Sequence, residues 1–140
     1  MRLFIDTNIL IDLLGHRAEH YQPAAELFSL ADKGSVELYV SALTMANAAY
    51  SLTKGAAQSE VKVWLQKVQL LLHVVALDEK ILNWALLDDK FQDFEDALQY
   101  CSAKEIKADA IITRNGKDFG ASDIPIFNAN EFLATLQSGK

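Results

Sequence analysis

Acidic residues in three separate segments are the features of this chain best suited to chemistry. Asp6 directly follows the apolar run Arg2–Ile5. A second segment contains Asp93 and Asp96, and a third contains Asp118. A carboxylate beside a buried strand is costly unless a partner or a ligand compensates its charge. Brought to one place, these carboxylates could hold a hard divalent cation.

Alternating strand and helix patterns would position these acids. Runs of strand-forming residues are expected at residues 2–5, 36–40, 73–76, 108–112 and 125–127. Between them, apolar residues recur at helical spacing. Alternation from end to end is typical of a parallel sheet with helices on both faces. We therefore predict an α/β fold, a three-layer α/β/α sandwich with a central, mostly parallel sheet, in a single domain spanning residues 1–140.

Two prolines give local predictions. Pro23 suits the first turn of a second helix, which places a polar loop over Arg17–Tyr21 before it. Pro125 predicts that the last strand lies at an edge of the sheet, because proline cannot donate a ladder hydrogen bond.

The predicted topology brings the acids together. In an open parallel sheet, ligands bind beyond the carboxyl ends of the strands. Asp6 lies at that end of the first strand, and Thr113 and Asp118 follow that end of the fourth. Asp96 lies in the first turn of the helix before the fourth strand, which we expect to start at the same edge. The alternative is helix capping, for which Asp6 and the pair Asp93–Asp96 are suitably placed. Three caps need not converge, whereas three metal ligands must.

A family resemblance rests on four segments that span nearly the whole chain: Phe4–Asn8, Val40–Thr44, Asp96–Leu98 and Ala108–Phe119. In this order and spacing they resemble the PIN domain, a family of small metal-dependent ribonucleases that includes the VapC-type toxins. The resemblance implies a parallel sheet flanked by helices, with one or two Mg²⁺ or Mn²⁺ ions in an acidic pocket.

The resemblance also implies roles for individual residues. Asp6, Asp96 and Asp118 would be the catalytic residues, as metal ligands or as holders of metal-bound water. Thr7 and Thr113 would orient the first carboxylate. The full set of implied supporting residues is Thr7, Asn8, Asn47, Asp93, Thr113 and Asn115.

One position departs from the family pattern. Strongly active members carry a Glu in the helix after the second strand, and Asn47 stands there. An amide oxygen can ligate Mg²⁺, but it brings no negative charge and cannot act as a base. Asp93, one helical turn before Asp96, is the predicted compensator. Asn47 fits equally well as a polar residue satisfied by the backbone.

Binding of RNA requires positively charged side chains near its backbone, although the chain has a formal net charge of -6. That charge argues against broad, nonspecific nucleic-acid binding. Arg114 and Lys117 flank the acidic edge and are the predicted RNA-binding residues. The toxin-like resemblance implies an antitoxin protein as partner. The broad apolar stripe of the helix around Trp64 predicts a homodimer, since symmetric pairs are the commonest oligomers.

Two functions remain open. The first is a divalent-metal-dependent ribonuclease that hydrolyses RNA phosphodiester bonds, as the toxin of a toxin–antitoxin pair. Products with 5′-phosphate and 3′-hydroxyl ends are expected from the resemblance. The second is a weakly active or non-catalytic PIN-like module that binds RNA or a protein. A receiver-type phosphoryl-transfer domain is disfavoured, because it predicts a second acid within two residues of Asp6, where Thr7 and Asn8 stand.

Composition predicts a folded protein of the cytoplasm. The 140 residues are 51% hydrophobic, which suits one domain with a sizeable core. The single cysteine, Cys101, cannot form an internal disulfide, and this fits a reducing compartment. No basic and apolar leader precedes the first strand, so we expect no secretory signal. The apolar run Leu70–Leu77 is far shorter than the roughly 20 residues that span a bilayer.

Overall fold

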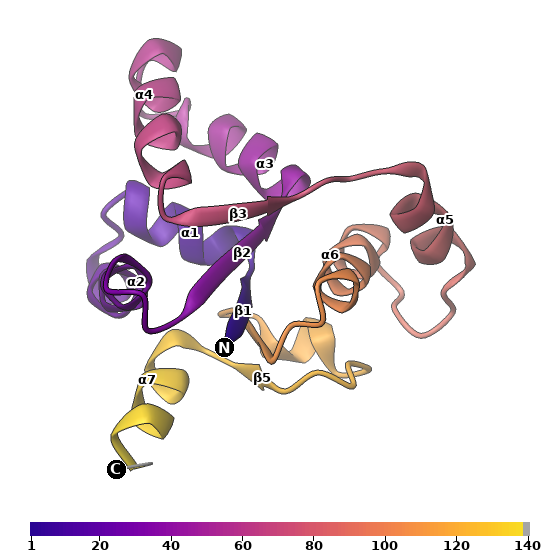
Figure 1. Ribbon diagram of the computed structural model, residues 1–140. Coiled ribbons are helices and arrows are strands. Elements are labelled where there is room, and N and C mark those ends of the chain that lie inside the picture. The colour runs from indigo at the N-terminus through magenta and orange to yellow at the C-terminus, as the bar shows by residue number, and fades with distance from the viewer. Residues whose placement is uncertain (139–140) are drawn as a thin grey trace.

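A parallel five-stranded sheet forms the centre of the molecule (Figure 1). The computed structural model describes residues 1–138, so the last two residues of the predicted domain lie outside the described part. The strands are β1 (Arg2–Ile5), β2 (Glu37–Ser41), β3 (Leu72–Val75), β4 (Ala110–Ile112) and β5 (Ile126–Phe127). Their order is β3-β2-β1-β4-β5, and every neighbouring pair is parallel. The strand β5 is an edge strand, as Pro125 predicted.

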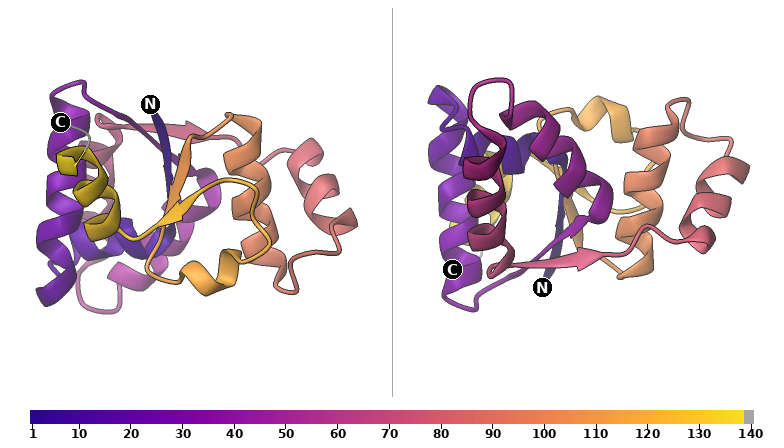
Figure 2. Two further views of the ribbon diagram at one scale, coloured as in Figure 1. Left: turned by 90° about the horizontal axis from the view of Figure 1, so that it is seen from below. Right: turned by 90° about the horizontal axis from the view of Figure 1, so that it is seen from above.

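Helices cover both faces of the sheet and complete the predicted α/β/α sandwich (Figures 1 and 2). One layer contains α1 (Thr7–Leu14), α2 (Ala18–Asp32), α3 (Ala42–Leu52), α4 (Gln58–Gln69) and α7 (Ala129–Ser138). The other contains α5 (Glu79–Leu87), α6 (Phe94–Glu105) and the 3-10 helix η1 (Gly116–Phe119). Within residues 1–138, no helix is both long and apolar enough to cross a membrane.

Side-chain alternation along β1 shows why both layers are needed. Leu3 and Ile5 are fully buried in the core under the larger helical layer. Phe4, between them, is fully buried in the core under α5 and α6. A strand that is apolar on both faces must be covered on both faces, and parallel sheets meet this requirement.

The start of α2 differs from the sequence-based prediction. The helix begins at Ala18, so Arg17–Tyr21 is largely helical and Pro23 lies inside the helix. The Arg17 carbonyl accepts hydrogen bonds from the amides of His20 and Tyr21, which starts the helix one turn early. The hydrogen bond that Pro23 cannot donate would reach a carbonyl in the exposed first turn, where water can replace it.

Candidate active site

The carboxyl ends of three neighbouring strands lead directly into polar side chains. Asp6 follows β1 and is the N-cap of α1, where its carboxylate accepts the Thr7 amide at 2.8 Å. Ser41 ends β2 and caps α3, accepting the Thr44 amide at 3.1 Å. Thr113 follows β4 and is buried. Because β2, β1 and β4 are adjacent and parallel, these groups line one edge of the sheet.

Several donors hold the Asp6 carboxylate in one orientation. Thr113 Oγ1 donates to Asp6 Oδ2 at 2.8 Å, as the sequence predicted for this threonine. Asn8 Nδ2 donates to the same oxygen at 3.3 Å, and Gln99 Nε2 donates to Oδ1 at 3.4 Å. Burial raises the pKa of Asp6 above its usual range, and the hydrogen bonds from Thr113, the Thr7 amide and Gln99 oppose the rise without cancelling it. The Thr7 amide also donates to the Asp6 carboxylate, whereas the Thr7 hydroxyl forms a hydrogen bond with Thr44 Oγ1 at 3.0 Å.

Gln99 is a site residue that sequence reasoning missed. It is only 2% exposed, and its amide joins three elements of the site. Its Oε1 accepts from Ser41 Oγ at 2.7 Å, while its Nε2 donates to Thr44 Oγ1 at 2.8 Å. The available signal was its place three residues after Asp96, on the same side of the helix.

The other two predicted carboxylates lie near Asp6, and we call the region around Asp6, Asp96 and Asp118 the acidic pocket. Burial raises the pKa of Asp96 to about 6, and the negative charges of Asp93, Asp118, Asp6 and Glu95 add to the effect. The charge of Asp118 also raises the pKa of Asp6. In the described chain, no hydrogen-bond donor reaches the carboxylate of Asp96 or Asp118. Three acids from distant segments therefore converge without a neutralising partner.

Two predicted supporting residues have mainly structural contacts. Asp93 is the N-cap of α6, and its carboxylate accepts the Asp96 amide at 3.0 Å. This is the capping role that the sequence left open. Asn115 is exposed and forms no side-chain cap on η1, but its amide donates to Thr113 Oγ1 at 3.0 Å.

The two predicted RNA-binding residues differ in their surroundings. The guanidinium of Arg114 forms a two-point ion pair with Asp12, with Nε–Oδ2 at 2.7 Å and Nη2–Oδ1 at 3.0 Å. Lys117 is exposed in η1, next to Asp118, and forms no ion pair with any residue in the described range. Its charge is therefore available next to Asp118 in the chain.

Asn47, the position that departs from the family pattern, contacts an acid. Its Nδ2 donates to Glu95 Oε1 at 2.6 Å, across the contact between α3 and α6. The side chain is thus satisfied by a carboxylate on a facing helix, and not by the backbone.

The model of the PIN domain family matches residues 2–117 of this chain. The chain belongs to the PIN domain family. It is similar to Ribonuclease VapC1 of Aquifex aeolicus (strain VF5), with 25% identity over 134 residues that make up 94% of this chain and 92% of the relative.

Solved structures share the fold of this PIN domain. A toxin–antitoxin complex from Klebsiella pneumoniae has a TM-score of 0.68 at 21% identity, covering 91% of this chain and 97% of that chain. VapBC2 from Rickettsia felis, bound to a DNA fragment from its promoter, has a TM-score of 0.67 at 20% identity, covering 91% and 98%.

The acidic pocket of this PIN domain fits a divalent cation by its donor chemistry. Carboxylate oxygens are the ligands that Mg²⁺ prefers, and the pocket holds unbalanced negative charge. Within residues 1–138, no group of three or more His, Cys, Asp or Glu side chains is already arranged to hold a metal ion. The fit therefore rests on the donor set and its charge.

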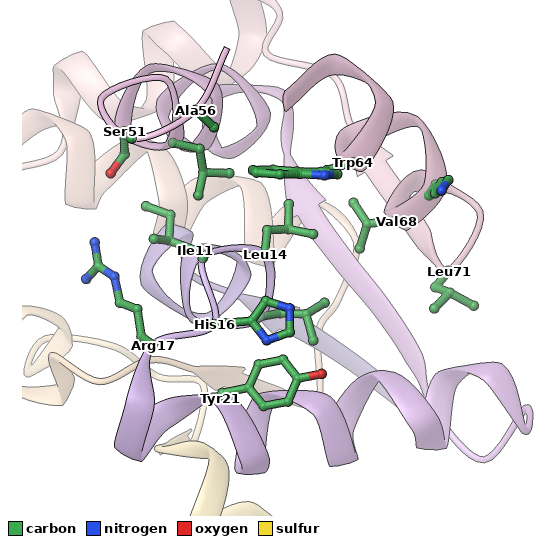
Figure 3. Close-up of a pocket in the computed structure, with 15 residues that line it drawn as sticks. Ile11, Leu14, His16, Arg17, Tyr21, Ser51, Ala56, Trp64, Val68 and Leu71 are labelled. Atoms are coloured by element: carbon green, nitrogen blue, oxygen red, sulfur yellow. The ribbon is translucent and has the colours of Figure 1, made fainter. Parts of the chain in front are cut away.

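A separate hollow of this PIN domain is apolar. It has a volume of about 690 Å³ and lies between the end of α1, the start of α2, α3 and α4 (Figure 3). Ile11, Leu14, Trp64 and Val68 line it, and His16 stacks on Tyr21 with ring centroids 4.4 Å apart. In the described chain, no acidic residue borders it, so it is distinct from the carboxylate pocket.

Proposed function

We propose that this PIN domain is a divalent-metal-dependent ribonuclease that hydrolyses RNA phosphodiester bonds as the toxin of a toxin–antitoxin pair. The observation that supports it best is the convergence of Asp6, Asp96 and Asp118. The charges of Asp118 and Asp6 add to burial in raising the pKa of Asp96, and the charge of Asp118 also raises the pKa of Asp6. The similarity to a ribonuclease over 94% of the chain points to the same reaction.

Each carboxylate has surroundings suited to a different task. Asp6, oriented by Thr113 and Asn8, would hold Mg²⁺ or Mn²⁺ together with Asp96. Asp118 is exposed at the rim and would orient the attacking water and take its proton. When bound, the ion supplies charge that stabilises the phosphodiester oxygens during hydrolysis. We expect 5′-phosphate and 3′-hydroxyl ends on the products.

The RNA backbone would approach along the side of the pocket that carries Lys117. This lysine has an unused charge beside Asp118, so it is the stronger of the two predicted RNA contacts. Arg114 would be the weaker RNA contact, because its guanidinium already binds Asp12.

The proposed biological partner is an antitoxin protein that covers the acidic pocket with an extended or helical segment. The solved relatives from Klebsiella pneumoniae and Rickettsia felis include toxin–antitoxin assemblies, which supports this partner. We also expect a homodimer in the cytoplasm. Tyr50 and Leu70 on the α3–α4 side are 72% and 86% exposed. Burying these apolar side chains in a dimer interface would be favourable.

An RNA cleavage assay tests the proposed function. Purified protein should cleave single-stranded RNA when Mn²⁺ or Mg²⁺ is added and should stop when the metal is chelated. Changing Asp6→Asn together with Asp96→Asn should lower the cleavage rate by about a thousandfold, equivalent to roughly 4 kcal/mol. Asp32→Asn, the same change at the exposed end of α2, should leave the rate unchanged.

RNA binding without cleavage under every divalent metal tested would favour the alternative of a non-catalytic module. Equal loss of activity in the Asp32→Asn control would instead assign the effect of the double variant to net charge and contradict the proposed roles of Asp6 and Asp96.

A further inference from the structure

The contact between Asn47 and Glu95 joins two helices that both border the acidic pocket. Asn47 Nδ2 donates to Glu95 Oε1 at 2.6 Å, although the residues are 48 positions apart in the chain. Asn47 is half-buried on α3, and Glu95 is in the first turn of α6. Because its acceptor is a carboxylate, this is a charge-assisted hydrogen bond.

A second contact runs beside the first and fixes its place in the site. Gln99 Nε2 donates to Thr44 Oγ1 at 2.8 Å, also between α6 and α3. Thr44 and Asn47 are three residues apart, and Glu95 and Gln99 are four apart, so each pair shares one helix face. Both contacts join α3 and α6, which belong to opposite helical layers, and the two contacts lie next to each other. The Thr44–Gln99 contact also reaches Asp6 through Gln99.

The partner of Glu95 leaves its charge intact. Asn47 is neutral, so the hydrogen bond orients the carboxylate without cancelling its negative charge. Among residues 1–138, Glu95 has no ion pair, and no other donor reaches its carboxylate. One oxygen, Oε2, and the whole charge remain available next to Asp96.

We propose that Glu95 is a fourth carboxylate of the divalent-ion site and that Asn47 is its positioning residue. This inference rests on the proposed metal-dependent function. The negative charge that Asn47 itself lacks then comes from the facing helix α6. Asp93, the compensator expected from the sequence, is also the helix cap, and its charge acts on Asp96 as well.

Mn²⁺ affinity, measured by isothermal titration calorimetry without RNA, tests this assignment. Glu95→Gln should weaken Mn²⁺ binding by at least about tenfold, and Asn47→Ala by a similar or smaller factor. The swap of Asn47→Glu with Glu95→Gln moves the carboxylate to α3 and keeps an amide opposite it. This double variant should bind Mn²⁺ within about threefold of the wild type. Glu26→Gln, an equal charge change at an exposed position of α2, is the control.

The possible results separate this inference from the proposed function. Wild-type affinity in Glu95→Gln, with binding lost in Asp96→Asn, overturns the role of Glu95 and keeps the metal site. Failure of the swap to recover affinity also contradicts the inference. Absence of Mn²⁺ binding and of cleavage in the wild type overturns the proposed function itself. Circular dichroism of each variant verifies that it is folded.

Discussion

The carboxylates near the two ends of α1 have opposite surroundings. Asp12, near the end of the helix, is 1% exposed and receives both arms of the Arg114 guanidinium. Asp6, at the start, shares its pocket with Asp96 and Asp118, and no cation within residues 1–138 pairs with any of the three. The same chemical group is thus neutralised in one place and left unbalanced in the other.

This difference separates a structural acid from a ligand-binding one. A buried charge is tolerated when a partner with good geometry compensates its desolvation, and the Asp12–Arg114 pair meets this condition. The acidic pocket has hydrogen-bond donors for Asp6 but no positive charge. Burial and mutual repulsion of these negative charges therefore carry a free-energy cost that protonation or a bound cation would relieve. The raised pKa of Asp96 reflects this cost.

Breaking the balanced pair should have the largest effect on stability. Arg114→Ala leaves the Asp12 carboxylate buried without its partner, which should lower the free energy of unfolding by about 3 kcal/mol. Urea denaturation followed by circular dichroism measures this change. Lys117→Ala, which removes the neighbouring exposed charge, should alter stability by less than about 0.5 kcal/mol.

A double variant sharpens this test. Adding Asp12→Asn to Arg114→Ala removes the stranded charge, so the double variant should be more stable than Arg114→Ala alone. Equal stability of Arg114→Ala and the wild type would show that the ion pair has no structural role.

Removing one donor to Asp6 should have an intermediate effect. Thr113→Val keeps the shape of a buried side chain but deletes the hydroxyl that donates to Asp6 Oδ2 at 2.8 Å. We expect a loss of about 1–2 kcal/mol in the free energy of unfolding. Thr53→Val, which removes a hydroxyl bonded to the Tyr50 carbonyl at an exposed helix end, should cost less than about 0.5 kcal/mol. Similar losses in both variants would argue against a special role for Thr113.

The smallest expected effect is the pH dependence of stability without metal. Because the pKa of Asp96 is raised from 3.8 to about 6, the folded protein binds more protons than the unfolded chain between these values. The free energy of unfolding should therefore fall as the pH rises through this window. Urea unfolding in metal-free buffer at pH 4.5 and pH 6.5 should show Asp96→Asn gaining stability relative to the wild type at the higher pH. An unchanged difference between the two proteins would contradict the raised pKa.

The sequence was sufficient to predict the sandwich and the convergence of the acids. Alternating strand and helix patterns implied a parallel sheet, and a parallel sheet brings the carboxyl ends of its strands to one edge. Asp6 and Thr113 follow from that geometry alone. The roles of Asp96 and Asp118 as ligands remain predictions, and the structure shows the charge of Asp118 acting on the pKa of Asp6 and of Asp96.

Other features depend on packing angles that local patterns do not encode. The Asn47–Glu95 contact requires the relative orientation of α3 and α6, and neither helix specifies it alone. Arg114 is predicted to bind RNA because it flanks the acidic edge, and the sequence did not indicate that its guanidinium pairs with Asp12 on α1. Pro23 suggested a helix start close to it, but the preference of proline for a first turn is only a tendency. The Arg17 carbonyl starts the helix earlier.

Anomalous diffraction from crystals soaked in Mn²⁺ tests the central claim most directly. The account predicts a manganese peak in the acidic pocket, with carboxylate oxygens of Asp6, Asp96 and Asp118 within coordination reach, and no such peak in Asp96→Asn crystals. A fully soaked wild-type crystal with an empty pocket, or with manganese bound only at other surface acids, would contradict it.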